Sequence, residues 1–296
     1  MTRTNRRSLW AAAAALLAAF AAAPGWHAPG HDRADRLVAK ALPAEMPDFF
    51  ADGVETIAHC SADPDLFRLK AAPQLRDAEA PQHFMDLELL AGEKLPPTRS
   101  AFHALCARNG LQPAKVGFVP YAVVEWTQRL TIAFAEHRKW PADPRIRGKC
   151  LVYAGILSHY AQDACQPLHT TIHYDGRAKA DGTSPRTGIH GRVDGLLSRA
   201  PGVKPGAIRC TAYEDVFAAV TARLREAHGL VDKVYQLDEH IPPGPPTRPA
   251  GPLPADSPAA AFAAERLAAA AEFTASLFLT AWRDSAKIAL PDWHRR

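Results

Sequence analysis

Residues 148–169 of this 296-residue chain are GKCLVYAGILSHYAQDACQPLH. From Gly148 to Cys165 the stretch is strongly apolar, and Pro167 ends the helix because proline disfavours helical geometry at the residue before it. His159 and Asp163 are four residues apart, so on a helix both project from the same face. The stretch predicts an apolar helix with a polar pair near its end.

Helical periodicity continues on both sides of this stretch, whereas alternating strand patterns are scarce. Amphipathic patterns cover residues 34–42, 121–137 and 212–230. The clearest helix is the last, whose apolar stripe steps by three and four residues: Ala263, Leu267, Ala270, Thr274, Leu277 and Ala281. We predict an all-α fold, with one domain spanning residues 26–296.

Two stretches are predicted to be loops. Residues 174–188 are rich in glycine, polar and charged residues, and residues 241–258 contain eight prolines. Such a density of proline excludes a regular helix. The second stretch is therefore expected to be a surface loop or a semi-rigid linker that leads into the final helix.

The first 25 residues have the layout of a secretory signal peptide. Arg3, Arg6 and Arg7 precede an apolar run from Leu9 to Ala23, and small residues follow before Trp26. The run is short and alanine-rich for a membrane span, although an uncleaved anchor is the alternative. We predict cleavage between Gly25 and Trp26 and a secreted or periplasmic protein.

The charge balance argues against binding of duplex nucleic acid by electrostatics alone. The formal net charge is +4, and the predicted signal peptide holds three arginines and no acid, which leaves about +1. No CxxC pair occurs, so a cysteine zinc site is not indicated, and the odd number of cysteines leaves at least one thiol unpaired. We expect them to act mostly as small buried apolar side chains: Cys60, Cys106, Cys150, Cys165 and Cys210.

Histidines and carboxylates recur with metal-ligand spacing. An imidazole and a carboxylate one helical turn apart suit zinc, and His169 follows the His159–Asp163 pair after the proline turn. The pair His190 and Asp194 repeats this spacing. One such pair alone is equally explained by a surface ion pair, but five ligands exceed the needs of one tetrahedral zinc and indicate several metals. Further candidates stand in WHAPGH, SADPDLFR and QHFMD: Trp26, His31, Asp63, Asp65, Arg68 and His83.

Together these motifs resemble the superfamily of zinc-dependent phospholipases C and single-strand-specific zinc nucleases, which are all-helical proteins with three zinc ions. The resemblance rests on an N-terminal Trp followed by His, an HFxD segment, HxxxD followed by QPLH, and a later HxxxD, in that order from Trp26 to Asp194. The closing helix ERLAAAAEFTASLFLTAW, residues 265–282, is also similar to that of the family.

The resemblance implies three Zn²⁺ ions and assigns their ligands. One ion would be held by Asp65, His83, His159 and Asp163. A second would be held by His169, His190 and Asp194, and the third by the amino group and carbonyl of Trp26 with His31 and the bridging Asp163. Asp63 is an alternative to Asp65. Asp65 and Arg68 are the expected catalytic residues, with Arg68 on a phosphate oxygen, and Phe84 is either core packing or part of a substrate wall.

The implied activity is phosphodiester hydrolysis by a metal-bound hydroxide. The five-residue spacing of Trp26 and His31, the QPLH segment and an aspartate at position 194 favour a nuclease acting on single-stranded nucleic acid or nucleotides. The final helix, with Thr274 and Trp282, favours a phospholipase C acting on phosphatidylcholine-like lipids. A third hypothesis is a secreted zinc-binding protein without activity. No stable protein partner is implied, and we expect a monomer.

Overall fold

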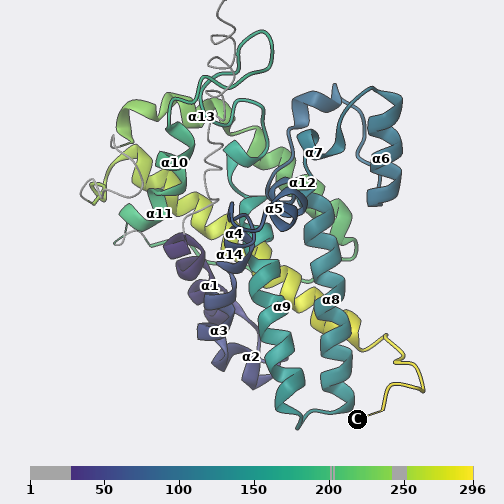
Figure 1. Cartoon of the computed structure of the whole chain (residues 1–296). Coiled ribbons are helices and arrows are strands. Elements are labelled where there is room, and N and C mark those ends of the chain that lie inside the picture. Colours follow the sequence, from purple (N-terminus) through teal and green to yellow (C-terminus); the bar gives the residue numbers. More distant parts are fainter. Residues whose placement is uncertain (1–27, 201, 203, 242–251, 296) are drawn as a thin grey trace, which may run out of the picture.

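The structure, a computed structural model, describes residues 28–200, 202, 204–241 and 252–295 (Figure 1). Within these residues the chain forms helices and no strands, with only two isolated bridges, Met85 to Gly117 and Tyr174 to Gly176. The prediction of an all-α fold is confirmed. The predicted signal peptide, Trp26 and most of the proline-rich segment lie outside the described residues.

Three long helices form the centre of the fold: α8 (Val119–Lys139), α9 (Pro144–Asp163) and α14 (Pro258–Ser285). Figure 1 shows α8 and α9 running side by side, with α14 crossing behind them. Each has a proline in its first turn, where the missing N–H is not needed. Asp143 and Ser257 cap α9 and α14 by accepting hydrogen bonds from Arg145 N (2.9 Å) and Ala260 N (3.2 Å). α8 and α14 extend beyond the periodic patterns that predicted them at both ends, whereas α9 begins before Gly148 and ends at Asp163, two residues before Cys165.

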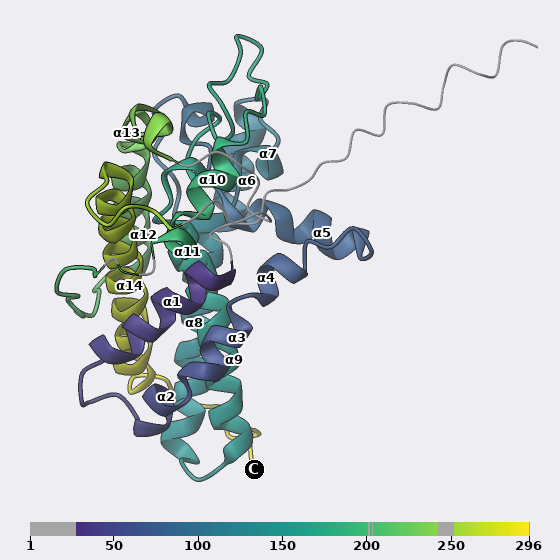
Figure 2. The ribbon, with the colours of Figure 1, turned by 90° about the vertical axis from the view of Figure 1, so that its left-hand side faces the viewer.

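Three N-terminal helices cover one side of this centre (Figure 2). They are α1 (Ala28–Ala41), which contacts α14 and α3, α2 (Asp48–Asp52), and α3 (Val54–Cys60), which packs on α9. The close approach of α3 to α9 depends on Gly155, because a Cβ there would lie 2.6 Å from both Cys60 Cβ and Ile57 O. The packing of α3 therefore holds the N-terminal segment against α9, the helix that carries His159 and Asp163.

Shorter helices surround the C-terminal end of α9. The predicted helix over 212–230 is observed as α12, and residues 174–188 form a loop as predicted. The α-helices here are α4 (Asp63–Leu66), α5 (Pro73–Glu79), α6 (Arg99–Arg108), α7 (Pro113–Val116), α10 (Ile189–Asp194), α11 (Leu196–Arg199), α12 (Val216–His228) and α13 (Val231–Gln236). The 3₁₀ turns are η1 (Ala80–His83), η2 (Leu87–Leu90), η3 (Pro167–His169) and η4 (Asp238–His240).

The buried apolar side chains form two clusters. The larger one lies among α8, α9 and the second half of α14, and it includes Phe50, Phe134 and Phe278. The smaller one joins α10, α11 and α13 to the first half of α14 around Phe262. Leu37 of α1 packs against both clusters, so α1 and α14 connect them. The division of the chain into domains stays a prediction.

All five cysteines carry free thiols, and the expectation that they are mostly buried is confirmed. Cys60, Cys106, Cys150 and Cys165 are buried, and Cys210 is half-buried. Burial raises the pKa of Cys165 to about 11, which keeps this thiol protonated and unreactive at neutral pH. Among the described residues, no helix combines the length and apolarity that a membrane span requires.

Gly155→Ala should destabilise the fold. The added methyl group would lie against Cys60 Cβ and the Ile57 carbonyl, and such overpacking typically costs about 1–3 kcal/mol. The matched control in the same helix is Gly148→Ala, whose Cβ would meet nothing within 4 Å and should stabilise α9 by about 0.5–1 kcal/mol. Urea unfolding of both variants measures the difference, and equal effects of the two substitutions would contradict the close contact of α3 with α9.

Candidate metal centre

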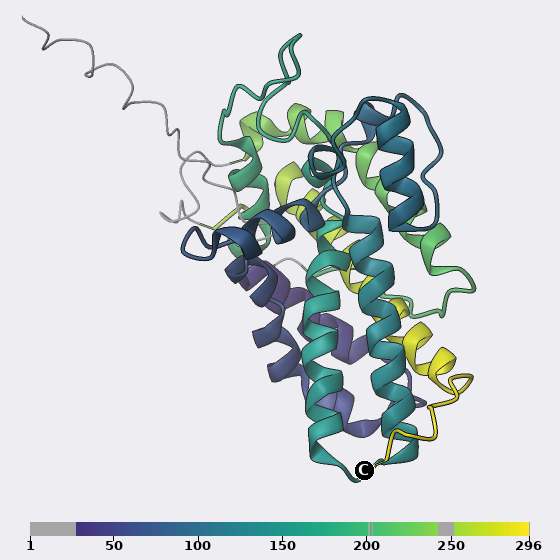
Figure 3. The ribbon, with the colours of Figure 1, turned by 45° about the vertical axis from the view of Figure 1, so that its right-hand side comes forward.

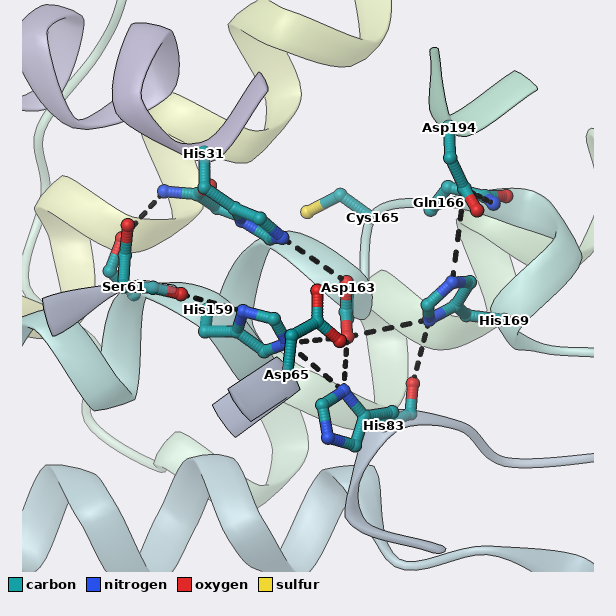
Figure 4. A network of polar contacts seen from close by, with 12 residues as sticks. His31, Ser61, Asp65, His83, His159, Asp163, Cys165, Gln166, His169 and Asp194 are labelled. Atoms are coloured by element: carbon teal, nitrogen blue, oxygen red, sulfur yellow. Dashed lines mark hydrogen bonds and ion pairs between the residues drawn. The ribbon is translucent and has the colours of Figure 1, made fainter. Parts of the chain in front are cut away.

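The structure brings the predicted histidine and aspartate ligands that it describes into one place (Figure 4). They form three groups, and in each group one ligand atom per residue lies within 4.8 Å of the others. The groups are His31, His159 and Asp163; Asp65, His83 and His159; and His169, His190 and Asp194. These eight side chains come from α1, α4, η1, α9, η3 and α10.

The carboxylate of Asp163 lies at the middle of this arrangement. Its Oδ2 atom is 3.1 Å from His83 Nδ1, 3.3 Å from His159 Nε2 and 3.5 Å from His169 Nδ1. Its Oδ1 atom is 3.8 Å from His31 Nε2. Asp163 is fully buried, so one carboxylate in the interior faces histidines from four segments of the chain.

Local sequence explains how α9 delivers these ligands. The helix ends at Asp163, and the backbone N–H of Gln166 donates to Asp163 O (3.0 Å), which begins the reversal of the chain. Pro167 then starts η3, and the Gln166 side chain caps this turn by accepting from the Leu168 N–H. The turn places His169 against Asp163, as expected from the proline.

Four imidazole rings are held in a common orientation. In each, Nδ1 lies within hydrogen-bond distance of a protein oxygen, an arrangement that leaves Nε2 of the neutral ring free to bind a metal. The oxygens are Gln162 Oε1 for His31 (2.7 Å), Ser61 O for His159 (2.8 Å), His83 O for His169 (2.8 Å) and Tyr174 O for His190 (3.2 Å). This is the arrangement that metal-binding histidines ordinarily have.

The third group is built around Asp194 at the end of α10. Its Oδ2 atom is 3.1 Å from His190 Nε2, its Oδ1 atom is 3.9 Å from His169 Nε2, and Gln166 Nε2 donates to Oδ1 (2.6 Å). The two rings are stacked, with centroids 5.0 Å apart. Asp175 anchors the start of α10 by accepting from the backbone N–H of Gly188 (2.6 Å).

Several atoms at this centre are buried without a hydrogen-bond partner among the described residues. A buried polar atom left unpaired typically costs about 1–3 kcal/mol. The atoms are His31 Nε2, His83 Nε2, Asp163 Oδ1, His169 Nε2 and Asp194 Oδ2. Imidazole nitrogens and carboxylate oxygens are zinc ligands, so these residues fit a bound metal, which would satisfy the unpaired atoms.

The charges of the centre are strongly coupled. Burial opposes ionisation of Asp163, but His169 and His159 outweigh it and hold the pKa of this carboxyl well below its usual range. Burial would lower the pKa of His169, but Asp163 and Asp194 raise it to about 9. The pKa of His31 falls to about 4 because of burial and the nearby His159. Without a metal cation, a proton on His169 therefore supplies a positive charge beside Asp163 and Asp194.

Asp65 and Arg68 lie at the more accessible edge of the centre. The Asp65 side chain is 19% exposed and accepts a hydrogen bond from Arg68 Nη1 (3.0 Å). Burial opposes ionisation of Asp65, but His159, His83 and Arg68 outweigh it and lower its pKa. None of the three groups found among the described residues includes Asp63. Of the two aspartates left open by the sequence, Asp65 is therefore the one that meets the histidines.

The remaining predicted residues have different outcomes. Trp26 lies outside the described residues, so its part in a metal site stays a prediction. Phe84 is half-buried between His83 and Met85, and its backbone carbonyl accepts from Val119 N (3.2 Å). This contact fixes the backbone of Phe84, and a role in binding substrate stays a prediction.

Several polar residues that contact the candidate ligands were not predicted from the sequence. Gln162 receives the His31 ring and donates to Asp35 Oδ1 (2.8 Å), whose carboxyl has its pKa raised to about 7 by burial. Glu79 accepts from the Tyr160 hydroxyl and lies 3.6 Å from His83 Nε2. The four-residue spacing of Glu79 and His83 was a usable signal. The spacing of Asp35 and Gln162, separated by 127 residues, was not.

No protein-family model matches the chain, and no curated protein matches it significantly. Among solved structures, it is similar to the crystal structure of the Clostridium perfringens alpha-toxin isolated from avian strain SWCP, with a TM-score of 0.36 and 13% sequence identity. The match covers 88% of this chain but only 63% of the toxin chain. A similarity of this size identifies neither a family nor an activity.

Gln162→Leu should weaken metal binding at His31 and leave the fold intact. The change removes the acceptor that orients the His31 ring, and loss of such a partner typically lowers metal affinity by about 10–100-fold. The matched control is Gln128→Leu on the exposed face of α8. Competition of each variant with a chromogenic zinc chelator measures the affinity. Equal affinity in both variants would remove Gln162 from the site.

The metal-free chain should lose stability as pH rises. Because the pKa of His169 is about 9 in the folded state and about 6.5 in an unfolded chain, its contribution is complete below pH 6.5 and is lost as pH rises through about 9. Excess zinc should reverse this trend, since the ion binds deprotonated imidazole. Melting temperatures across this range, with chelator or with zinc, test both slopes, and parallel curves would contradict metal binding at His169.

Proposed function

We propose that this protein is a zinc-dependent hydrolase of phosphodiester bonds. The observation that carries the proposal is the buried Asp163 carboxylate facing four histidines, with unpaired ring nitrogens and carboxylate oxygens around it. Nitrogen and oxygen ligands without cysteine suit zinc, and several ligand groups a few ångströms apart suit hydrolysis of phosphoesters.

In this proposal, three zinc ions use the ligands that the sequence resemblance implied. Asp163 would serve both the ion held by Asp65, His83 and His159 and the ion held by His31. His169, His190 and Asp194 would hold the third ion. The α-amino group and carbonyl of Trp26 complete the site at His31 once the signal peptide is cleaved, so the proposal includes residence in the periplasm or outside the cell.

Residues at the accessible edge would act on the substrate. Bound zinc would supply a hydroxide near neutral pH. Asp65 is ionised and partly exposed, so its carboxylate can accept a hydrogen bond from the attacking water and hold it in place. Arg68, which donates to Asp65, would bring a positive charge to the same edge, beside a bound phosphate. Positioning and charge neutralisation are what this class of reaction needs most.

The identity of the phosphodiester is a finer question. A nuclease acting on single-stranded nucleic acid or nucleotides stays a prediction, with phospholipase C activity on phosphatidylcholine-like lipids as its alternative. A secreted zinc-binding protein without activity is the non-enzymatic hypothesis. We also propose that the chain acts as a monomer without a stable protein partner.

Asp163→Asn should abolish the activity, because it removes the shared charged ligand. The chain beginning at Trp26 is loaded with zinc and tested on single-stranded DNA, RNA, 3′-mononucleotides and phosphatidylcholine, with and without chelator. We expect the wild type to hydrolyse at least one substrate, and Asp163→Asn to lower kcat/KM at least about 100-fold. Intact substrates with zinc bound would establish the non-catalytic hypothesis instead.

The two early aspartates provide a matched comparison in the same assay. Asp65→Asn should lower kcat far more than Asp63→Asn, because only Asp65 meets His83 and His159. A larger loss of kcat in Asp63→Asn would contradict this assignment and give the role of Asp65 to Asp63.

A further inference from the structure

Exposed apolar side chains gather directly beside the candidate metal centre. Leu66, Leu69 and Leu75 are 55%, 56% and 44% exposed, and the first of them follows Asp65 in the chain. The other large exposed apolar side chains among the described residues are Ile132, Tyr174, Ile288 and Trp293, on other segments of the fold. We name residues 66–76, which hold the three leucines, the leucine lip.

The leucine lip does not serve the hydrophobic core. Its last four residues, 73–76, lie on α5, a helix without a single buried residue. A helix that packs on a folded body ordinarily buries an apolar stripe. Figures 2 and 3 show α5 projecting away from the central helices. Leu66, Leu69 and Leu75 belong to neither of the two buried clusters and do not pack against them.

The cations of the lip alternate with its leucines. Residues 66–76 include Arg68, which pairs with Asp65, the exposed Lys70, and Arg76, and acidic residues stand just outside these bounds, Asp65 before them and Asp77 after them. Leucines interspersed with cations are typical of segments that lie in the surface of a lipid layer, where apolar side chains enter the acyl boundary and cations face phosphate groups.

Other partners fit the lip less well. Single-stranded nucleic acid is ordinarily bound on exposed aromatic rings, whereas the only aromatic residue of the lip, Phe67, is half-buried. A stable dimer buries about 800 Å² on each partner, which is more than three half-exposed leucines offer. A lipid surface requires neither an aromatic platform nor a large complementary face.

We propose that the leucine lip docks this protein on the surface of an anionic phospholipid layer. Leu66 enters the apolar boundary next to Asp65, while Lys70 contacts headgroup phosphates. Docking places the accessible edge of the metal centre, formed by Asp65 and Arg68, against the layer. If the proposed hydrolase function holds, the substrate is then a phosphodiester within that layer.

Vesicle binding tests the lip without any need for turnover. The full chain and its variants are sedimented with vesicles of phosphatidylcholine mixed with phosphatidylglycerol, in the presence of chelator. Each Leu→Gln change at 66, 69 and 75 should lower partitioning about fivefold, from the apolar area that it removes. The matched control is Ile132→Gln with Ile288→Gln, which changes similarly exposed side chains elsewhere and should bind as the wild type does.

A charge variant keeps the test decisive if the triple leucine variant folds poorly. Lys70→Glu should weaken binding to the mixed vesicles and lose its effect in high salt. Unchanged binding of both the leucine variants and Lys70→Glu, or an equal loss in the isoleucine control, would overturn the proposal. So would a leucine-dependent change in oligomeric state without vesicle binding.

Turnover separates failure of the lip from failure of the proposed function. With zinc, the ratio of hydrolysis of vesicle phospholipid to hydrolysis of soluble bis(p-nitrophenyl) phosphate should fall at least about tenfold in the triple leucine variant. Leucine-dependent vesicle binding with no hydrolysis of either substrate would contradict the proposed hydrolase function and support docking through the lip. Hydrolysis of the soluble ester without leucine-dependent vesicle binding would support the hydrolase function and contradict docking through the lip. An equal loss of single-stranded DNA cleavage in the leucine variant would assign the lip to nucleic acid and overturn the lipid proposal.

Discussion

The negative charge of Asp163, buried in an apolar helical bundle, constrains which residues can pack around it. Removing a carboxylate from water costs several kcal/mol unless cations or hydrogen bonds compensate it. Here the compensation comes mainly from His169 and His159, while His31 and His83 also face the carboxylate from other segments. The packing of α1 and the turns η1 and η3 against the end of α9 can therefore be understood as the scaffold that a buried anion requires.

Local spacing explains how much of this centre was predictable. His159 with Asp163, and His190 with Asp194, are one helical turn apart, so a helical pattern alone places each pair on one face. The long helices were predictable for the same reason, since periodicity over many residues is a strong signal. His31 and His83 have no such local partner among the ligands, and they were assigned only through the family resemblance.

Features that depend on tertiary contact escaped prediction. Asp35 and Gln162 form one polar unit with the His31 ring, but 127 residues separate them, and neither belongs to a metal-binding motif. The short helices α4 and α5 are too brief to show a period, and whether their leucines are buried depends on what packs over them. The phosphodiester substrate could not be predicted for the same reason. The metal ligands favour a type of reaction, whereas the surrounding surface determines which substrate reaches them.

The free thiols have a consequence for where this protein can fold. The five cysteines form no cross-link, four are buried, and burial keeps a thiol such as Cys165 protonated. Packing and polar contacts, which do not depend on the redox potential of the surroundings, hold the described part of the chain together. The same native state is therefore accessible under reducing conditions inside a cell and oxidising conditions outside it.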